Sequence, residues 1–136
     1  MNELNKKIRI AIVLDENSTH AYDLILETFL EPEILEIFTP VVYGSLHMLK
    51  QKSSRLQIRY NALIVGNASQ ADPDALNFVD LNGRNAVEVV KREFEANLLD
   101  AFVVVPMSRE ITNQLRNAVI PNPVLKRQEN DIRQYL

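Results

Sequence analysis

The segment Asn82–Glu110, NGRNAVEVVKREFEANLLDAFVVVPMSRE, contains the features that decide the fold. Its first half has an apolar residue at every fourth position, as on one face of an amphipathic helix: Ala86, Val90, Phe94 and Leu98. The run AFVVV at 101–105 is too short for a helix and apolar throughout, which is typical of an inner parallel strand covered on both faces. Pro106 ends this strand because it has no N–H to donate, and Ser108 can cap the next helix. A helix, a buried strand and a second helix in succession indicate an α/β protein.

The remainder of the chain continues the alternation of strands and helices. Apolar and β-branched runs predict strands at 8–14, near the centre of the sheet, at 41–43, and, as an edge strand, at 78–81. Residues 56–60 alternate like a strand with one wet face, and 63–65 either continue it or form a strand of their own. Helical patterns are predicted at 21–30, 33–38, 45–52, 85–98 and 110–118. Alternating elements of this kind predict a three-layer αβα architecture with a mostly parallel sheet.

The chain is expected to form one α/β domain over residues 1–136, with a disordered tail at 1–7. After the prolines at 121 and 123, residues 121–136 are expected to contain a C-terminal helix with apolar side chains along one side. That helix either covers the core of its own domain or forms a dimer contact.

Composition excludes several classes of function. A net charge of −3 with scattered lysines and arginines offers no surface for nucleic acid. Because the chain contains no cysteine, disulfides, thiolate metal sites and thiol nucleophiles are excluded. No apolar stretch approaches the ~20 residues of a membrane span, and the first apolar run lacks the features of a signal peptide. A soluble, cytoplasmic protein is expected.

Two loops at the carboxyl ends of predicted strands contain the candidate ligand-binding residues, since ligands of open α/β sheets bind at that edge. In the first loop, Ser18 and Thr19 could hold an anion and His20 could act as an acid or base; the alternative is a polar loop with a helix cap. In the second, Ser108 and Arg109 could grip a phosphate or carboxylate; the alternative is a cap beside a surface arginine. No catalytic constellation and no metal-ligand set is predicted, and no cofactor is expected.

Several segments resemble the 4-hydroxythreonine-4-phosphate dehydrogenases, the PdxA family. These segments are IAIVL at 10–14, YDLILETF at 22–29, EPEILE at 31–36, TPVVYGS at 39–45, GRNAVE at 83–88 and LDAFVVVPMSR at 99–109. The resemblance implies part of an isocitrate/isopropylmalate-dehydrogenase-like fold, a homodimer, and NAD- and divalent-metal-dependent oxidation on the route to pyridoxal phosphate.

The motifs by which that family binds its substrate are altered in this chain. The family carries the glycine-rich GDPAGIGPE or a close variant after its first strand, where residues 15–23 contain no glycine, and a lysine where Arg109 stands. The PGHTE motif of the family is replaced by IPNPV at 120–124, and its metal-binding histidines belong to a part of the fold beyond Leu136. The leading hypothesis is therefore a truncated, degenerate relative, non-catalytic by itself, that self-associates or binds a protein partner or small anion. The alternatives are a dehydrogenase whose site, with NAD and metal, is completed by another chain, and an unrelated nucleotide-binding regulator.

Overall fold

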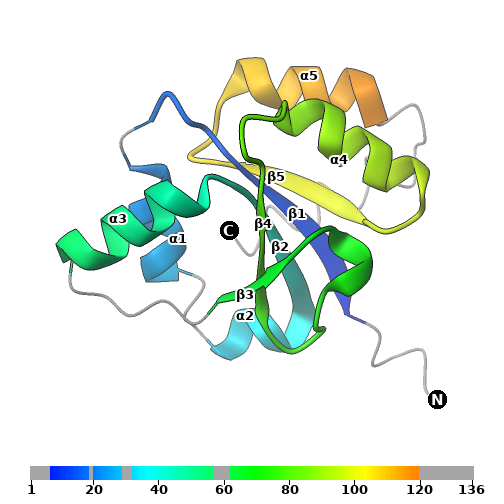
Figure 1. Cartoon of the computed structure of the whole chain (residues 1–136). Coiled ribbons are helices and arrows are strands. Elements are labelled where there is room, and N and C mark those ends of the chain that lie inside the picture. Colours follow the sequence, from blue (N-terminus) through cyan, green and yellow to red (C-terminus); the bar gives the residue numbers. More distant parts are fainter. Residues whose placement is uncertain (1–6, 19, 29–31, 57–61, 120–136) are drawn as a thin grey trace.

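The computed structural model describes residues 7–18, 20–28, 32–56 and 62–119, without the side chains of residues 26–28, 32 and 56 (Figure 1). A five-stranded sheet lies at the centre, in the order β3-β4-β2-β1-β5, and every pair of neighbouring strands in it is parallel. Its strands are β1 (Ile8–Leu14), β2 (Phe38–Gly44), β3 (Ala62–Val65), β4 (Leu76–Asp80) and β5 (Ala101–Val105).

Helices cover both faces of this sheet, which confirms the predicted three-layer α/β architecture. One face packs against α1 (Ala21–Thr28), α2 (Pro32–Ile37) and α3 (Leu46–Leu56), and the other against α4 (Ala86–Glu95) and α5 (Arg109–Val119). Figure 1 shows α4 and α5 side by side on their face, with α1 and α3 together on the opposite one. None of the helices in the described part of the chain is both long and apolar enough to cross a membrane.

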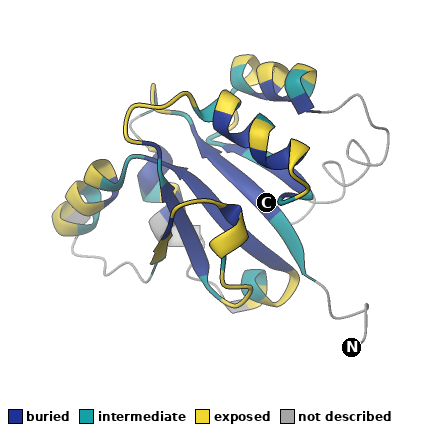
Figure 2. Ribbon diagram, turned by 45° about the vertical axis from the view of Figure 1, so that its right-hand side comes forward, coloured by how far each residue is buried: buried dark blue, intermediate teal, exposed yellow. Residues whose placement is uncertain are grey.

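Alternation along the strands divides the core between the two faces. In β1, Ala11 and Val13 point toward α4 and α5, whereas Ile10, Ile12 and Leu14 point toward α1 and α3. All of these side chains are at most 2% exposed, and the interior strands form a continuous buried band in Figure 2. Covered faces on both sides explain why β1 is apolar from Ile10 to Leu14.

Two strands occupy positions in the sheet other than those predicted. β5, expected to be an inner strand, pairs only with β1 among the described strands and lies at one edge of the sheet. β4, expected at an edge, lies between β2 and β3. The apolar run of β5 was a correct indicator of burial, because Ala101, Phe102 and Val104 are buried. Apolarity, however, shows only that the faces of a strand are covered, not that both of its edges are paired.

Element boundaries also differ from the predictions, most of all at the start of β2 and the end of α3. β2 begins at Phe38, inside the predicted helix, and contains Pro40, whose carbonyl accepts a hydrogen bond from Asn77 Nδ2 at 3.1 Å. The helix expected to stop at Lys52 continues to Leu56, so the strand predicted from residue 56 is wrong at its first position. Residues 57–60 of that strand lie outside the described residues, whereas 63–65 belong to a separate strand, β3.

The sequence places Ser45 and Ser108 as helix caps, and both are confirmed, while Asn85 provides a cap that was not predicted. Asn85 Oδ1 accepts from the N–H of Glu88 at the start of α4, and Ser45 Oγ accepts from the N–H of Met48 in α3. Lys7, expected in the disordered tail, contacts Asp74 with its ammonium at 2.5 Å. The rest of that tail and the predicted helix at 121–136 lie outside the described residues, and the division into a single domain stays a prediction.

Candidate functional site

The two predicted ligand loops meet at the carboxyl edge of the sheet, as expected from the strand pattern. The ladder between β1 and β5 continues one step into the first loop, where the N–H of Asp15 donates to the carbonyl of Val105 at 2.9 Å. Asp15 then folds the loop back on itself: its carboxylate accepts from the N–H of Asn17 at 3.1 Å and its carbonyl from that of Ser18 at 3.0 Å. The first loop is therefore a tight local turn leading into α1.

The four candidate residues that the structure describes do not converge on one site. Ser18 Oγ accepts from the N–H of His20 at 3.1 Å, and His20 itself is exposed, with Nδ1 3.9 Å from a carboxylate oxygen of Asp23. Thr19 lies outside the described residues. Ser108 Oγ accepts from the main-chain N–H three residues later and so caps α5, while Arg109 is exposed in the first turn of that helix. Of the four described candidates, only Ser18 lines the cavity described next.

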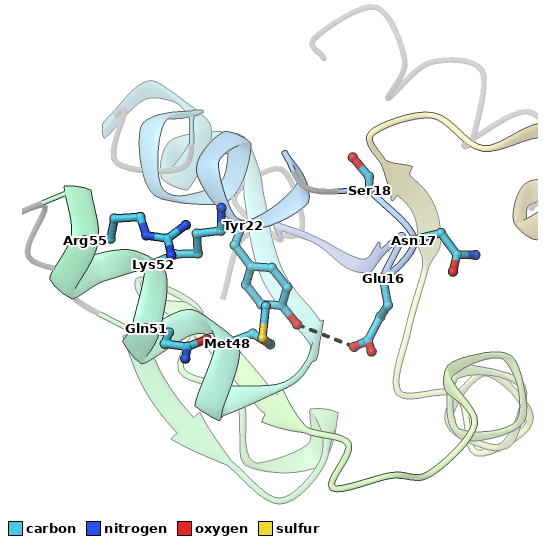
Figure 3. Close-up of a pocket in the computed structure, with 8 residues that line it drawn as sticks. All are labelled: Glu16, Asn17, Ser18, Tyr22, Met48, Gln51, Lys52 and Arg55. Atoms are coloured by element: carbon cyan, nitrogen blue, oxygen red, sulfur yellow. Dashed lines mark hydrogen bonds between the residues drawn. The ribbon is translucent and has the colours of Figure 1, made fainter.

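A cavity of about 290 Å³ opens between the first loop and α3 (Figure 3). The loop and α1 contribute one wall, and α3 contributes the other; the lining residues are Glu16, Asn17, Ser18, Tyr22, Met48, Gln51, Lys52 and Arg55. The α3 residues were not predicted from the sequence. Their spacing was the available signal, because positions 48, 51, 52 and 55 fall on one face of a helix.

Tyr22 connects the two walls of the cavity through hydrogen bonds of its hydroxyl group. Its Oη accepts the N–H of Ser45, just before α3, at 2.7 Å and donates to Glu16 Oε1 at 3.4 Å. Burial raises the pKa of Tyr22 to about 12; the hydrogen bond from Ser45 opposes this rise, and the nearby charge of Glu16 adds to it. The phenol therefore stays protonated near neutral pH and serves as a structural link between β1–α1 and α3.

Gly44 allows the Tyr22 hydroxyl to come this close. A Cβ at that position would lie 3.0 Å from Tyr22 Oη and 2.8 Å from Leu14 Cδ1. Such distances lie inside van der Waals contact, so a side chain here would push the tyrosine or the end of β1 aside.

Charge is distributed unevenly around the cavity. Lys52 and Arg55 lie one helical turn apart on α3, and Lys52 Nζ is 3.6 Å from Asp23 Oδ1. Figure 3 shows both cationic side chains reaching from α3 toward α1, with Glu16 on the opposite side, in the first loop. The cavity thus has a cationic end at α3 and a carboxylate at the loop.

The described residues do not fit the cofactors that the family resemblance implies. They contain no group of three or more histidine, aspartate or glutamate side chains placed to hold a metal ion. The first loop contains no glycine, so its backbone lacks the residue type that lets a dinucleotide phosphate approach closely. No step of a reaction is therefore assigned to NAD or to a metal here.

Comparison with known proteins identifies relatives of this chain. It is 29% identical over 121 residues to the 4-hydroxythreonine-4-phosphate dehydrogenase of Bacteroides thetaiotaomicron, a match that covers 76% of this chain. The chain is related to these dehydrogenases. It spans about a third of the length of that relative, 33%, and no protein-family model matches it.

Solved structures of the same enzymes share the fold. A 4-hydroxythreonine-4-phosphate dehydrogenase from Burkholderia phymatum superposes with a TM-score of 0.64 at 14% identity, covering 89% of this chain and 42% of that one. The enzyme of the same name from Klebsiella pneumoniae gives a TM-score of 0.53 at 17% identity, covering 87% and 42%. At these identities the structures establish the α/β architecture alone.

Proposed function

We propose that this chain is a PdxA-like α/β domain that does not catalyse dehydrogenation by itself and acts through self-association. One observation supports the non-catalytic reading: three polar side chains of the two carboxyl-edge loops are engaged in local structure. Asp15 closes its own turn, Ser18 accepts from His20, and Ser108 caps α5. Groups committed to local turns and caps do not form a nucleophile–base pair or an open phosphate cradle.

An enzyme assay tests this reading directly. The purified chain is mixed with 4-hydroxythreonine-4-phosphate, NAD and either Mg²⁺ or Zn²⁺, and NADH formation is followed by absorbance. We expect no formation above the rate without protein, with a full-length 4-hydroxythreonine-4-phosphate dehydrogenase as the positive control. Clear turnover by the chain alone rejects the proposal.

The edge strand β3 supports self-association. Leu63 and Ile64 point to opposite sides of this strand and are 44% and 45% exposed, and β3 pairs only with β4 among the described strands. An unpaired, apolar edge is a template for another strand, and two copies related by a twofold axis would pair antiparallel through it. We therefore propose that two copies of the chain dimerise through the outer edge of β3.

The dimer is tested by light scattering after size-exclusion chromatography at micromolar concentration. The wild type is expected at twice the chain mass, and the double variant Leu63→Lys/Ile64→Lys at the mass of one chain. Met107→Lys is the matched control, because Met107 is 71% exposed beyond the opposite edge of the sheet. A monomeric wild type, or a double variant that dimerises as well as the control, contradicts the assignment.

A second function is favoured by the relationship to the dehydrogenases. In this alternative, the chain contributes to pyridoxal phosphate biosynthesis, with NAD and a divalent metal, at a site completed by another chain. It predicts that Arg109, exposed at the start of α5, contacts ligand in the assembled site. Mixing the chain with a full-length dehydrogenase subunit should then raise turnover, and Arg109→Ala should abolish the increase.

A further inference from the structure

The connection from β3 to β4 crosses the sheet face that α4 and α5 cover. It contains the 3₁₀ turn η2 (Ala68–Gln70), and Ala68, 1% exposed, packs among the buried residues of that face. Gln70 Oε1 accepts from the N–H of Gly66, the first residue after β3, at 2.7 Å, so the turn is bonded to the end of the edge strand. A displacement of η2 would therefore displace the end of β3.

Glu93 attaches this turn to α4 through a buried carboxylate. The residue is 6% exposed, and glutamate is rarely buried this far unless its charge has a partner. Its Oε1 accepts from the N–H of Ala68 at 2.5 Å, a charge-assisted bond between residues 25 positions apart in the chain. The position of η2 thus depends on one side chain of α4 as well as on the burial of Ala68.

The other oxygen of this carboxylate is not satisfied. Glu93 Oε2 and Tyr43 Oη are both buried, and neither makes a hydrogen bond within the described residues. The two groups are nonetheless close: burial raises the pKa of the Tyr43 phenol well above its usual range, and the charge of Glu93 adds to the rise. A carboxylate in such surroundings costs more free energy to bury than an apolar side chain, so core stability alone does not explain a glutamate at this position.

We propose that Glu93 is a positioning residue for the dimer edge: by holding η2, it fixes the end of β3 in the geometry that pairs with a second copy of the chain. β3 has four residues and pairs only with β4 among the described strands, so it has few bonds of its own to keep it in place. The exposed Leu63 and Ile64 lie directly before the part of the strand that η2 holds. This inference rests on the dimer proposed above and adds the residue that controls its affinity.

Amide exchange tests the anchor in the absence of a dimer. In the background of the double variant Leu63→Lys/Ile64→Lys, the N–H of Ala68 and the amides of β3 should exchange through one shared opening with the same urea dependence. The ladder between β1 and β2 should open separately, at a higher free energy. Glu93→Leu in this background should speed exchange at Ala68 and in β3 about tenfold or more, because the N–H loses a charged acceptor. Glu93→Gln should restore slow exchange, since the amide oxygen of glutamine can accept the same bond.

The dissociation constant of the dimer tests what the anchor does for pairing. Measured by sedimentation over a range of concentrations in chains with native β3, it should rise about tenfold or more for Glu93→Leu and stay near the wild-type value for Glu93→Gln. Glu95→Leu is the matched control, because Glu95 is exposed on the same helix, and it should leave the dissociation constant unchanged. A purely structural role would lower the free energy of unfolding, measured in urea in the double-variant background, without raising the dissociation constant of the folded chains.

The outcomes separate this inference from the proposed function. A monomeric wild type overturns the dimer and this inference with it. A dimeric wild type whose Glu93→Leu variant pairs as tightly as Glu95→Leu overturns this inference alone, and so do separate openings of Ala68 and β3. If Glu93→Leu does not fold, the shared opening decides, because it is measured with Glu93 in place.

Discussion

Substitution of Gly44 by alanine should destabilise the fold at the junction of β1, β2 and α1. The added Cβ would lie 2.8 Å from Leu14 Cδ1, 3.0 Å from Tyr22 Oη and 3.4 Å from Phe78 Cζ. Adding a methyl group to a packed core typically costs about 1–3 kcal/mol. If Tyr22 moves away, its hydrogen bond from the N–H of Ser45 is also lost, which adds about 0.5–1.5 kcal/mol. The expected loss in the free energy of unfolding is therefore about 2–4 kcal/mol.

Urea unfolding at equilibrium measures this loss, with Gly66→Ala as the control. Gly66 is exposed, and a Cβ there meets only the end of the flexible Gln70 side chain, at 3.1 Å. That substitution should change the free energy of unfolding by less than about 1 kcal/mol. The reasoning about close packing is refuted if Gly44→Ala costs no more than Gly66→Ala.

A double-mutant cycle then identifies which neighbour resists the methyl group. Tyr22→Phe removes the oxygen at 3.0 Å but leaves the contact with Leu14 in place. In this background, Gly44→Ala should cost less than in the wild type, with a coupling of about 1 kcal/mol. Additive effects would show that Leu14 alone sets the penalty.

Three further predictions concern stability. Asn77 is fully buried; its Nδ2 donates to three main-chain carbonyls and its Oδ1 accepts from the N–H of Asp72. Asn77→Ala should therefore lower the free energy of unfolding, measured in urea, by about 3 kcal/mol or more, whereas alanine in place of an exposed asparagine should not. Tyr22 has a folded-state pKa of about 12 against 10.0 for a free tyrosine. The stability that its protonated phenol gives to the fold is therefore complete below pH 10 and is lost as pH rises toward 12. Tyr22→Phe should flatten this decline in the free energy of unfolding. Ser108→Ala should lower stability by about 0.5–2 kcal/mol and speed amide exchange at Ile111, and unchanged exchange would exclude the cap.

Much of the scaffold was predictable because its signals are local. The period of α4 and the apolar runs of β1 and β5 indicated the right elements, and Ser108 caps α5 through its own side chain as predicted. The position of a strand within the sheet, by contrast, cannot be predicted from local sequence. β4 and β5 exchange their predicted roles because the order of strands depends on crossovers and not on the composition of either strand.

The start of β2 and the lining of the cavity were missed for a different reason: each depends on a partner remote in sequence. Pro40 reads as a breaker, yet it lies within β2, where its carbonyl accepts from Asn77, 37 residues away. Lys52 and Arg55 read as an ordinary solvated helix face. That they line a cavity is seen only once the first loop, more than 30 residues earlier in the chain, is placed opposite them.

The position of that cavity differs from the usual ligand position in an open parallel sheet. In open parallel sheets, ligands commonly occupy the crevice where successive crossovers leave in opposite directions. Here that point lies between β1 and β5, since β1 leads toward β2 on one side and α4 returns the chain to β5 on the other. The hydrogen bond from Asp15 to Val105 extends the ladder across this point, and the loop then turns toward α1. The cavity lined by the first loop and α3 lies on the α1–α3 face of the sheet, where Tyr22 links its two walls. A substitution that opens the Tyr22 link, such as Tyr22→Phe, should therefore speed amide exchange at Ser45, whose N–H loses its acceptor, while leaving the β1–β5 ladder protected.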